Sequence, residues 1–211
     1  RATLADSLKM VLFLTVPTSA LIVGLAVPVT RAIYERGRFT AADTVATAGA
    51  LVLYTLGIPF MSALRNVAAV FYAHKDSRTP MMASFASIAL NLVLNATLMW
   101  VLGFLAFPLS TTLAAILNVG ILYALLPRKI GAMPLGPLAA YAGKLAAASA
   151  AGGAVAWLGS LFLAARFGTS FPATAASVAV CGLAGLAVFF AAARVLGLRE
   201  TRDFVRRFLR R

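Results

Sequence analysis

The sequence predicts an all-α protein, a polytopic transmembrane helix bundle with six spans and a basic amphipathic C-terminal tail. Of its 211 residues, 62% are hydrophobic and 12% are charged, and the mean hydropathy is +0.92. Soluble domains contain about 45–50% apolar and about 25% charged residues. The apolar residues here gather in six runs, each long enough to supply the about 20 helical residues that cross the hydrocarbon core. Composition and grouping together exclude a soluble domain.

These runs make up a membrane domain over residues 1–197, and a tail follows at residues 198–211. In chain order the spans are expected at residues 10–30, 43–73, 80–104, 107–126, 138–164 and 173–197. The chain begins with Arg1 rather than Met, and residues 1–9 lack the pattern of a signal peptide. We therefore expect a fragment or a processed product.

Short polar segments predict where the spans begin and end. Thr40 and Asp43 form a capping-box-like start for the second span. Thr79–Pro80 supplies an N-cap and a first-turn proline for the third span. Residues 104–108 leave room for only a short turn, so the third and fourth spans are expected to form an antiparallel hairpin. Residues 127–137 are too rich in Pro and Gly to continue a helix and are expected to form a loop.

The charged residues indicate that the anionic partner is lipid. The chain has 19 Lys and Arg against 6 Asp and Glu, a net charge of +13. A nucleic-acid-binding protein gathers such charge on one soluble face. Here the basic residues lie between apolar runs, at the level of lipid headgroups. We expect anionic membrane lipids as partners, and no nucleic acid.

The same residues predict the orientation, because basic residues gather on the cytoplasmic side of a membrane protein. With six spans, twelve basic residues fall on the side of the two termini and four on the other side. Those four are Arg31, Arg36, Arg38 and Arg166. Both termini are therefore expected in the cytoplasm.

The tail has the pattern of a basic amphipathic helix. Phe204 and Phe208 fall on one face, and Arg202 and Arg206 on another. This pattern predicts a helix lying on the inner leaflet. A dedicated lipid-phosphate site is the alternative.

Two features of the second span are candidates for a transport path. Arg65 lies seven residues before Tyr72, about 10 Å from the cytoplasmic end of the helix. Its side chain either extends to the interface or faces a polar cavity and an anionic substrate. Gly57 and Pro59 interrupt the same helix, which indicates either a bend beside a transport path or a static packing kink.

The third span carries a polar face. Ser84, Ser87, Asn91 and Asn95 are spaced 3, 4 and 4 residues apart, which places them on one side of a helix. The short hairpin turn brings Thr111 to the depth of Asn95. Their oxygens either hydrogen-bond between helices or bind a small hard cation such as Na⁺.

The sequence contains no pattern typical of catalysis. The one histidine, His74, lies in a loop, and the one cysteine, Cys181, excludes an intrachain disulfide and a cysteine-based metal cluster. No span carries an acidic pair, and no metal-ligand spacing or Gly-rich phosphate loop occurs. We expect no enzyme activity, no catalytic residue, no metal centre and no cofactor.

Two sequence blocks carry a family resemblance. "ERGRFTAADT" (residues 35–44) follows one span, and "FYAHKDSRTP" (residues 71–80) separates the next two. With the short hairpin and the final pair of spans, they resemble the MurJ/MviN family of lipid II flippases. That family belongs to the multidrug/oligosaccharidyl-lipid/polysaccharide exporter superfamily.

The resemblance implies the last six helices of a fourteen-helix transporter with both termini in the cytoplasm of a bacterium. It implies lipid II, a lipid-linked peptidoglycan precursor, as the substrate, moved across the inner membrane by alternating access without covalent chemistry. The facing N-terminal lobe would be a further partner, and the last two helices would border a groove for the polyprenyl tail. The alternatives are a related cation-coupled exporter of drugs or polysaccharide lipids, and a structural bundle without transport.

The resemblance also suggests site residues. Arg65 looks like a basic position near the cytoplasmic mouth, and we expect it, Lys75 and Arg78 to attract the substrate's pyrophosphate. Asn91, Asn95 and Thr111 look like the positions that bind Na⁺ in some members. Asn95 stands where those members have Asp, so this chain lacks the formal charge. Two alternatives therefore stay open: coupling to Na⁺, and no coupling ion.

Overall fold

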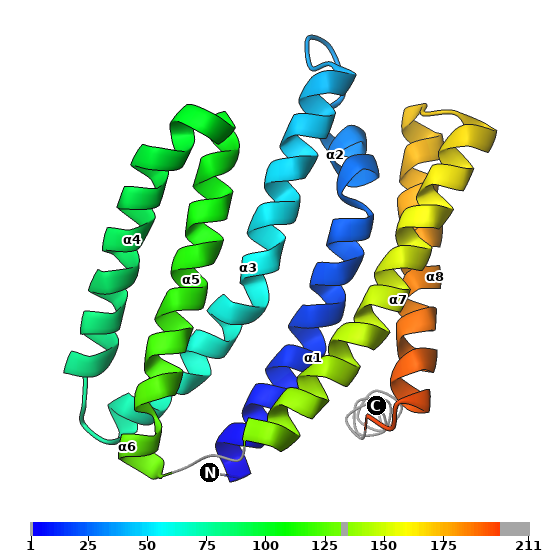
Figure 1. The fold of residues 1–211 in the computed structure, drawn as a ribbon. Helices are drawn as coiled ribbons and strands as arrows, with labels where there is room; N and C mark the ends of the chain where they lie inside the picture. Colours follow the sequence, from blue (N-terminus) through cyan, green and yellow to red (C-terminus); the bar gives the residue numbers. More distant parts are fainter. Residues whose placement is uncertain (1, 132–134, 199–211) are drawn as a thin grey trace. The chain divides into compact units, whose positions relative to one another are not determined.

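The computed structural model describes residues 2–131 and 135–198, and every regular element in these two ranges is a helix (Figure 1). All of the tail except Leu198 lies outside the described residues. The helices are α1 (Ala2–Gly24), α2 (Ala26–Tyr34), α3 (Ala41–Ala73), α4 (Arg78–Leu102), α5 (Ala106–Leu125), α6 (Pro127–Ile130), α7 (Leu135–Phe167) and α8 (Phe171–Val195), with a 3₁₀ turn, η1, at Gly103–Leu105.

The helices belong to two compact units. Unit 1 takes in Leu53–Leu138 together with the chain up to Thr15, and unit 2 takes in Val16–Val52 together with the chain from Ala139. The core of unit 1 is built around Leu8, Phe71 and Leu122, and that of unit 2 around Leu25, Ala156 and Cys181. Each unit is described by itself below.

The membrane fold expected from the hydropathy is confirmed. Five helical segments in the described ranges are long and apolar enough to cross a bilayer. One of them, residues 78–130, contains the α4–α5 hairpin and so accounts for two crossings (Figure 1). The turn between these helices is the 3₁₀ turn η1, which is as short as the sequence predicts.

The start of the second span is also confirmed. The Asp43 carboxylate accepts hydrogen bonds from the Thr40 backbone N–H, at 2.8 Å, and from the Thr40 hydroxyl, at 2.7 Å. The Thr40 hydroxyl in turn accepts from the Asp43 N–H at 3.3 Å. This reciprocal pair satisfies N–H groups that the first turn of a helix leaves without a partner.

The predicted start of the third span at Thr79–Pro80 is wrong by a short distance. Helix α4 begins at Arg78, and the carboxylate of Asp76, rather than Thr79, caps its N-terminal end. The Asp76 Oδ1 accepts from the Thr79 N–H at 3.0 Å, and Oδ2 accepts from the Thr79 hydroxyl at 2.8 Å. Asp is among the strongest N-cap residues, and Thr79 lies within the first turn.

The loop predicted at residues 127–137 is too long at both ends, because α6 occupies its start and α7 begins at Leu135. Pro127–Ile130 forms the helical turn α6, which follows α5 directly, and Gly131, with φ 72°, ends it. Pro127 is tolerated because the first turn of a helix has no need of its N–H. Gly131 therefore ends this helical turn, whereas Pro127 begins it.

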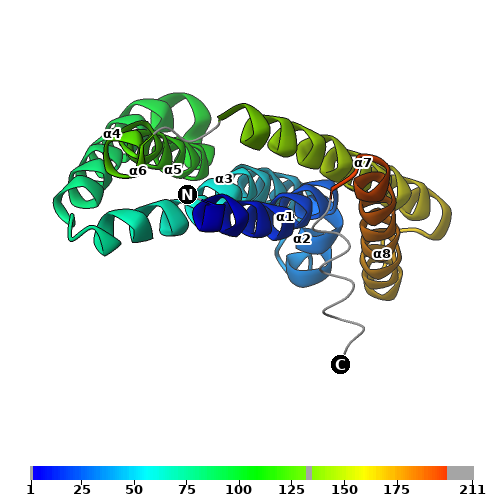
Figure 2. The same ribbon diagram turned by 90° about the horizontal axis from the view of Figure 1, so that it is seen from below.

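Glycines let the helices of unit 2 approach closely. In Figure 2, α8 lies against α7, and a Cβ atom added to Gly152 of α7 would lie 2.6 Å from the carbonyl oxygen of Gly185 in α8. A Cβ on Gly153 would lie 2.7 Å from the carbonyl oxygen of Ala20 in α1. Small residues at such contacts are typical of membrane helices.

This packing predicts that Gly152→Ala destabilises the protein by about 1–3 kcal/mol, the usual range for overpacking a tight contact. The added methyl group meets backbone, which cannot rotate away. Gly143→Ala is the matched control, because Gly143 lies on the same helix with nothing within 4 Å of the added Cβ. Thermal unfolding in detergent checks this, and equal melting temperatures for the two variants would contradict it.

Candidate functional site

The three residues expected to bind a cation lie together in unit 1. The Asn95 Nδ2 donates to the Asn91 Oδ1 at 3.0 Å along α4, and the Asn91 Nδ2 donates to the Thr111 hydroxyl of α5 at 3.5 Å. The Thr111 hydroxyl donates to the Phe107 carbonyl at 2.8 Å. The hairpin therefore brings these side chains into one hydrogen-bonded group between the two helices. We call it the amide cluster.

One buried oxygen of the amide cluster accepts no hydrogen bond from the described residues. The Asn95 Oδ1 is buried and has no hydrogen-bond partner in the part of the chain that the structure describes. An unpaired amide oxygen in an apolar interior is costly. The donor set is all oxygen, as hard cations require, but it is neutral, since the sequence of α4 and α5 contains no Asp or Glu.

Two more polar contacts join α5 to its neighbours, one to α4 and one to α3. The Asn118 Nδ2 donates to the Ser84 hydroxyl of α4 at 3.5 Å, and the Thr112 hydroxyl donates to the Leu53 carbonyl of α3 at 2.6 Å. A Cβ on Gly57 would lie 2.8 Å from the Thr112 hydroxyl. Helix α3 is continuous through Gly57 and Pro59. The short distance to Thr112 makes Gly57 a contact point for α5. Sequence reasoning had singled out Gly57 without its partner.

The three expected substrate-binding residues do not form one cluster. Lys75 and Arg78 lie in and just after the turn between α3 and α4, and both are exposed. Arg65 lies on α3, ten residues before Lys75, which is about 15 Å along a helix axis. Arg65 is exposed, and within the described residues it has no hydrogen bond or ion pair.

Lys75 has a backbone role that the sequence did not indicate. It has φ 57°, in the left-handed region, which is unusual for a residue other than glycine. Its N–H donates to the Tyr72 carbonyl and the Asp76 N–H donates to the Phe71 carbonyl, both at 2.9 Å. This pair of bonds is a Schellman motif, which ends helix α3. The side chain of Lys75 is thereby held at the surface.

Asp76 is the central residue of this turn. Besides capping α4, its Oδ2 pairs with the Lys129 Nζ of α6 at 2.8 Å. The Lys129 ammonium, followed by the two Thr79 hydrogen bonds, holds the pKa of the Asp76 carboxyl well below its usual range. The backbone N–H of Asp76 thus helps to end α3, and its carboxylate fixes the start of α4 and the position of α6. From the sequence, Lys129 was one of the basic residues expected at the membrane surface, and its pairing with Asp76 was not predicted.

The chain is similar to a set of known membrane proteins. The family model described as "Lipid II flippase MurJ" matches residues 1–194. A protein of Rhizobium meliloti (strain 1021) named "Probable lipid II flippase MurJ" is 30% identical over 193 residues, which cover 90% of this chain and 36% of that protein. One of the same name from Rickettsia prowazekii (strain Madrid E) is 35% identical over 119 residues, 56% of this chain and 24% of that protein.

A solved structure shares the fold. "Lipid II flippase MurJ, inward closed conformation" superposes with a TM-score of 0.71 and 25% sequence identity, over 96% of this chain and 39% of that one. The chain therefore spans between a quarter and two fifths of the length of these proteins.

The Asp76–Lys129 pair predicts a pH-dependent stability. Because the folded-state pKa of Asp76 lies below the unfolded value of about 3.9, its contribution is present above that pH and is lost as the pH falls. We expect Asp76→Asn, which keeps a capping oxygen, to melt at a lower temperature than the parent at pH 7. The difference should narrow progressively as the pH falls below about 4. Lys129→Gln should give the same profile, and a difference that does not narrow as the pH falls would contradict the assignment.

Proposed function

Because this chain belongs to the lipid II flippase MurJ family, we propose that it is the C-terminal part of a transporter that moves lipid-linked peptidoglycan precursor across the bacterial inner membrane. The family match over residues 1–194 carries the proposal. The shared fold supports it, because the structure it resembles bears the same name. The activity belongs to the whole protein, in which the N-terminal lobe faces these helices.

We further propose that both termini are cytoplasmic. The basic residues support this orientation, since twelve lie on the side of the termini and four on the other. The turn between α3 and α4 and the short helix α6 then lie on the cytoplasmic side, where the precursor is made and loaded. The cytoplasmic basic residues also suit anionic lipids of the inner leaflet.

Transport of a lipid between leaflets changes no covalent bond, so binding and release are the steps to explain. The pyrophosphate of the precursor is the group that a basic surface attracts. We propose that the exposed Lys75 and Arg78 attract it to the cytoplasmic end, and that Arg65, deeper on α3, contacts it once it has entered. The spacing of about 15 Å between Arg65 and the turn supports two successive contacts rather than one shared site.

The amide cluster is the proposed place for a coupling ion. Na⁺ would be held by three oxygens: the unpaired Oδ1 of Asn95, the Oδ1 of Asn91 and the hydroxyl of Thr111. The Na⁺ gradient across the membrane would then drive transport. Binding would exchange the hydrogen bonds of the cluster for ion contacts. With neutral ligands alone, such a site binds weakly, because no carboxylate offsets the loss of hydration.

The first test of the function is Arg65→Ala in the full-length protein. We expect a clear loss of lipid II exposed on the outer leaflet, measured in cells depleted of their own flippase, because a charge that meets the pyrophosphate is removed. Arg65→Lys should retain part of the activity. Arg128→Ala, an exposed basic residue on α6, is the control and should leave transport unchanged. Wild-type transport by Arg65→Ala would refute the role of Arg65.

The second test addresses the ion. Asn95→Asp introduces the missing charge and should make thermal stability rise with NaCl concentration relative to matched KCl, whereas the parent should respond little. Thr111→Val in the same background should abolish the response, because it removes a ligand oxygen. If Asn95→Asp shows no preference for Na⁺ over K⁺, the amide cluster acts only in helix packing.

A further inference from the structure

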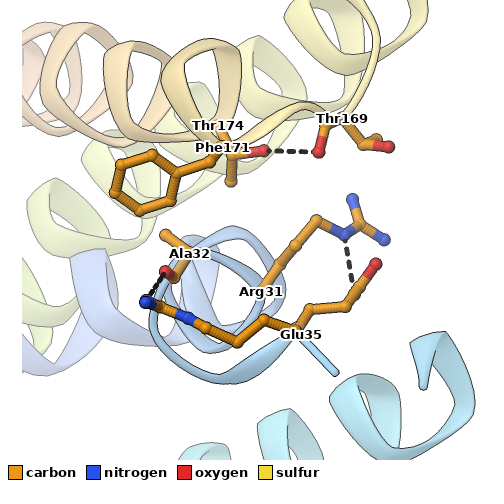
Figure 3. Close-up of a pocket in the computed structure, with 7 residues that line it drawn as sticks. Arg31, Ala32, Glu35, Thr169, Phe171 and Thr174 are labelled. Atoms are coloured by element: carbon orange, nitrogen blue, oxygen red, sulfur yellow. Dashed lines mark hydrogen bonds and ion pairs between the residues drawn. The ribbon is translucent and has the colours of Figure 1, made fainter. Parts of the chain in front are cut away.

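A polar pocket lies in unit 2, where α2 ends and α8 begins. It has a volume of about 220 Å³ and is lined by Arg31, Ala32, Glu35, Arg36, Thr169, Phe171 and Thr174. Figure 3 shows Arg31 and Glu35 on one wall and Thr169, Phe171 and Thr174 on the other. The function proposed above uses none of these residues.

The arginines leave the pocket with donors to spare. The Arg31 Nε pairs with the Glu35 Oε2 at 3.0 Å, and its two Nη groups have no hydrogen-bond partner among the described residues. The Arg36 Nη2 donates to the carbonyls of Ala32 and Ile33, and its guanidinium lies 5.7 Å from the centre of the Phe171 ring. Two cations face one carboxylate, so the pocket has a net positive charge.

Glu35 holds Arg31 in place rather than cancelling the site. Its Oε2 also accepts from the Thr44 hydroxyl at 2.7 Å. The Thr44 hydrogen bond, and then the one from Arg31, lower the pKa of the Glu35 carboxyl, so it stays ionised. The side chains of Arg31 and Glu35 are 22% and 25% exposed, so the pair is partly shielded from water. The N-terminal end of the 25-residue helix α8 adds a favourable field for an anion.

An apolar groove adjoins the polar pocket. It has a volume of about 330 Å³, and its lining includes Val27, Val45, Val52, Trp157 and Leu161. Arg31 lines both spaces. The exposed side chains of Val45 and Trp157, at 61% and 53%, indicate that the groove is open to its surroundings. A charged space and an apolar space that meet at one arginine match a molecule with a charged head and a hydrocarbon chain.

We propose that unit 2 binds an anionic phospholipid here, with its phosphate at Arg31 and Arg36 and one acyl chain along the apolar groove. The pocket has room for about seven waters at ~30 Å³ each, which suits a phosphodiester group. Phosphate matches the geometry of guanidinium donors. The lipid would come from the leaflet opposite the termini, a detail that rests on the proposed topology. Binding itself does not rest on the transport function.

The experiment measures lipid binding by the full-length protein in a neutral detergent. Short-chain phosphatidylglycerol is titrated, with phosphatidylcholine and inorganic phosphate as comparison ligands. Arg31→Gln and Arg36→Gln should each weaken phosphatidylglycerol binding about tenfold, as expected for loss of a charge-assisted hydrogen bond. Arg38→Gln is the matched control, because Arg38 is near in sequence but does not line the pocket.

A groove variant separates a lipid from a free anion. Val45→Trp fills the apolar groove at an exposed position, so it should weaken phosphatidylglycerol binding and leave phosphate binding unchanged. Equal effects of Arg31→Gln and Arg38→Gln, or equal binding of phosphatidylcholine, would overturn the proposal. Unchanged lipid binding by Val45→Trp would reduce the site to a phosphate site and also overturn it. Thermal unfolding of each variant confirms folding, and Arg36→Gln, at an exposed residue, serves if Arg31→Gln does not fold.

Discussion

The weakness of the hydrophobic effect between helices in lipid is the constraint on which this structure depends. Lipid chains are as apolar as the side chains they surround, so helices must be joined by polar bonds and by close contact. Unit 1 uses polar bonds, from the amide cluster to the Thr112 hydroxyl on the Leu53 carbonyl. Unit 2 uses close contact, through Gly152 and Gly153. The two units therefore satisfy one physical demand in two ways.

This constraint explains why the candidate ion site is also a packing site. In the amide cluster, the atoms that would bind Na⁺ are the atoms that join α4 to α5. An ion could bind only by replacing these bonds, so occupancy and the fit of the hairpin would be linked. The unpaired oxygen of Asn95 shows that the bonds within the cluster do not satisfy every group. A site of this kind can be changed by one substitution, because its geometry is already present.

The sequence predicted what depends on local pattern. Hydropathy gave the six crossings, and the Thr40–Asp43 spacing gave the start of α3, because both need only neighbouring residues. It did not predict the pairing of Asp76 with Lys129, which requires two turns far apart in the chain to meet. The cap at Thr79 failed for a different reason: Asp76, Ser77 and Thr79 all suit that role, and the local pattern does not choose among them. The polar pocket was missed because Arg31 and Phe171 belong to distant segments.

Two carboxylates organise the basic residues in similar ways. Asp76 accepts hydrogen bonds from Thr79 and pairs with Lys129, and Glu35 accepts from Thr44 and pairs with Arg31. In each case a threonine hydroxyl of the following helix holds the carboxylate, and the carboxylate holds a cation. A fixed cation loses less conformational entropy when it binds an anion than a freely moving one does. The few acidic residues of this strongly basic chain therefore do more than reduce its charge. They fix the positions of the cations that a phosphate group would contact.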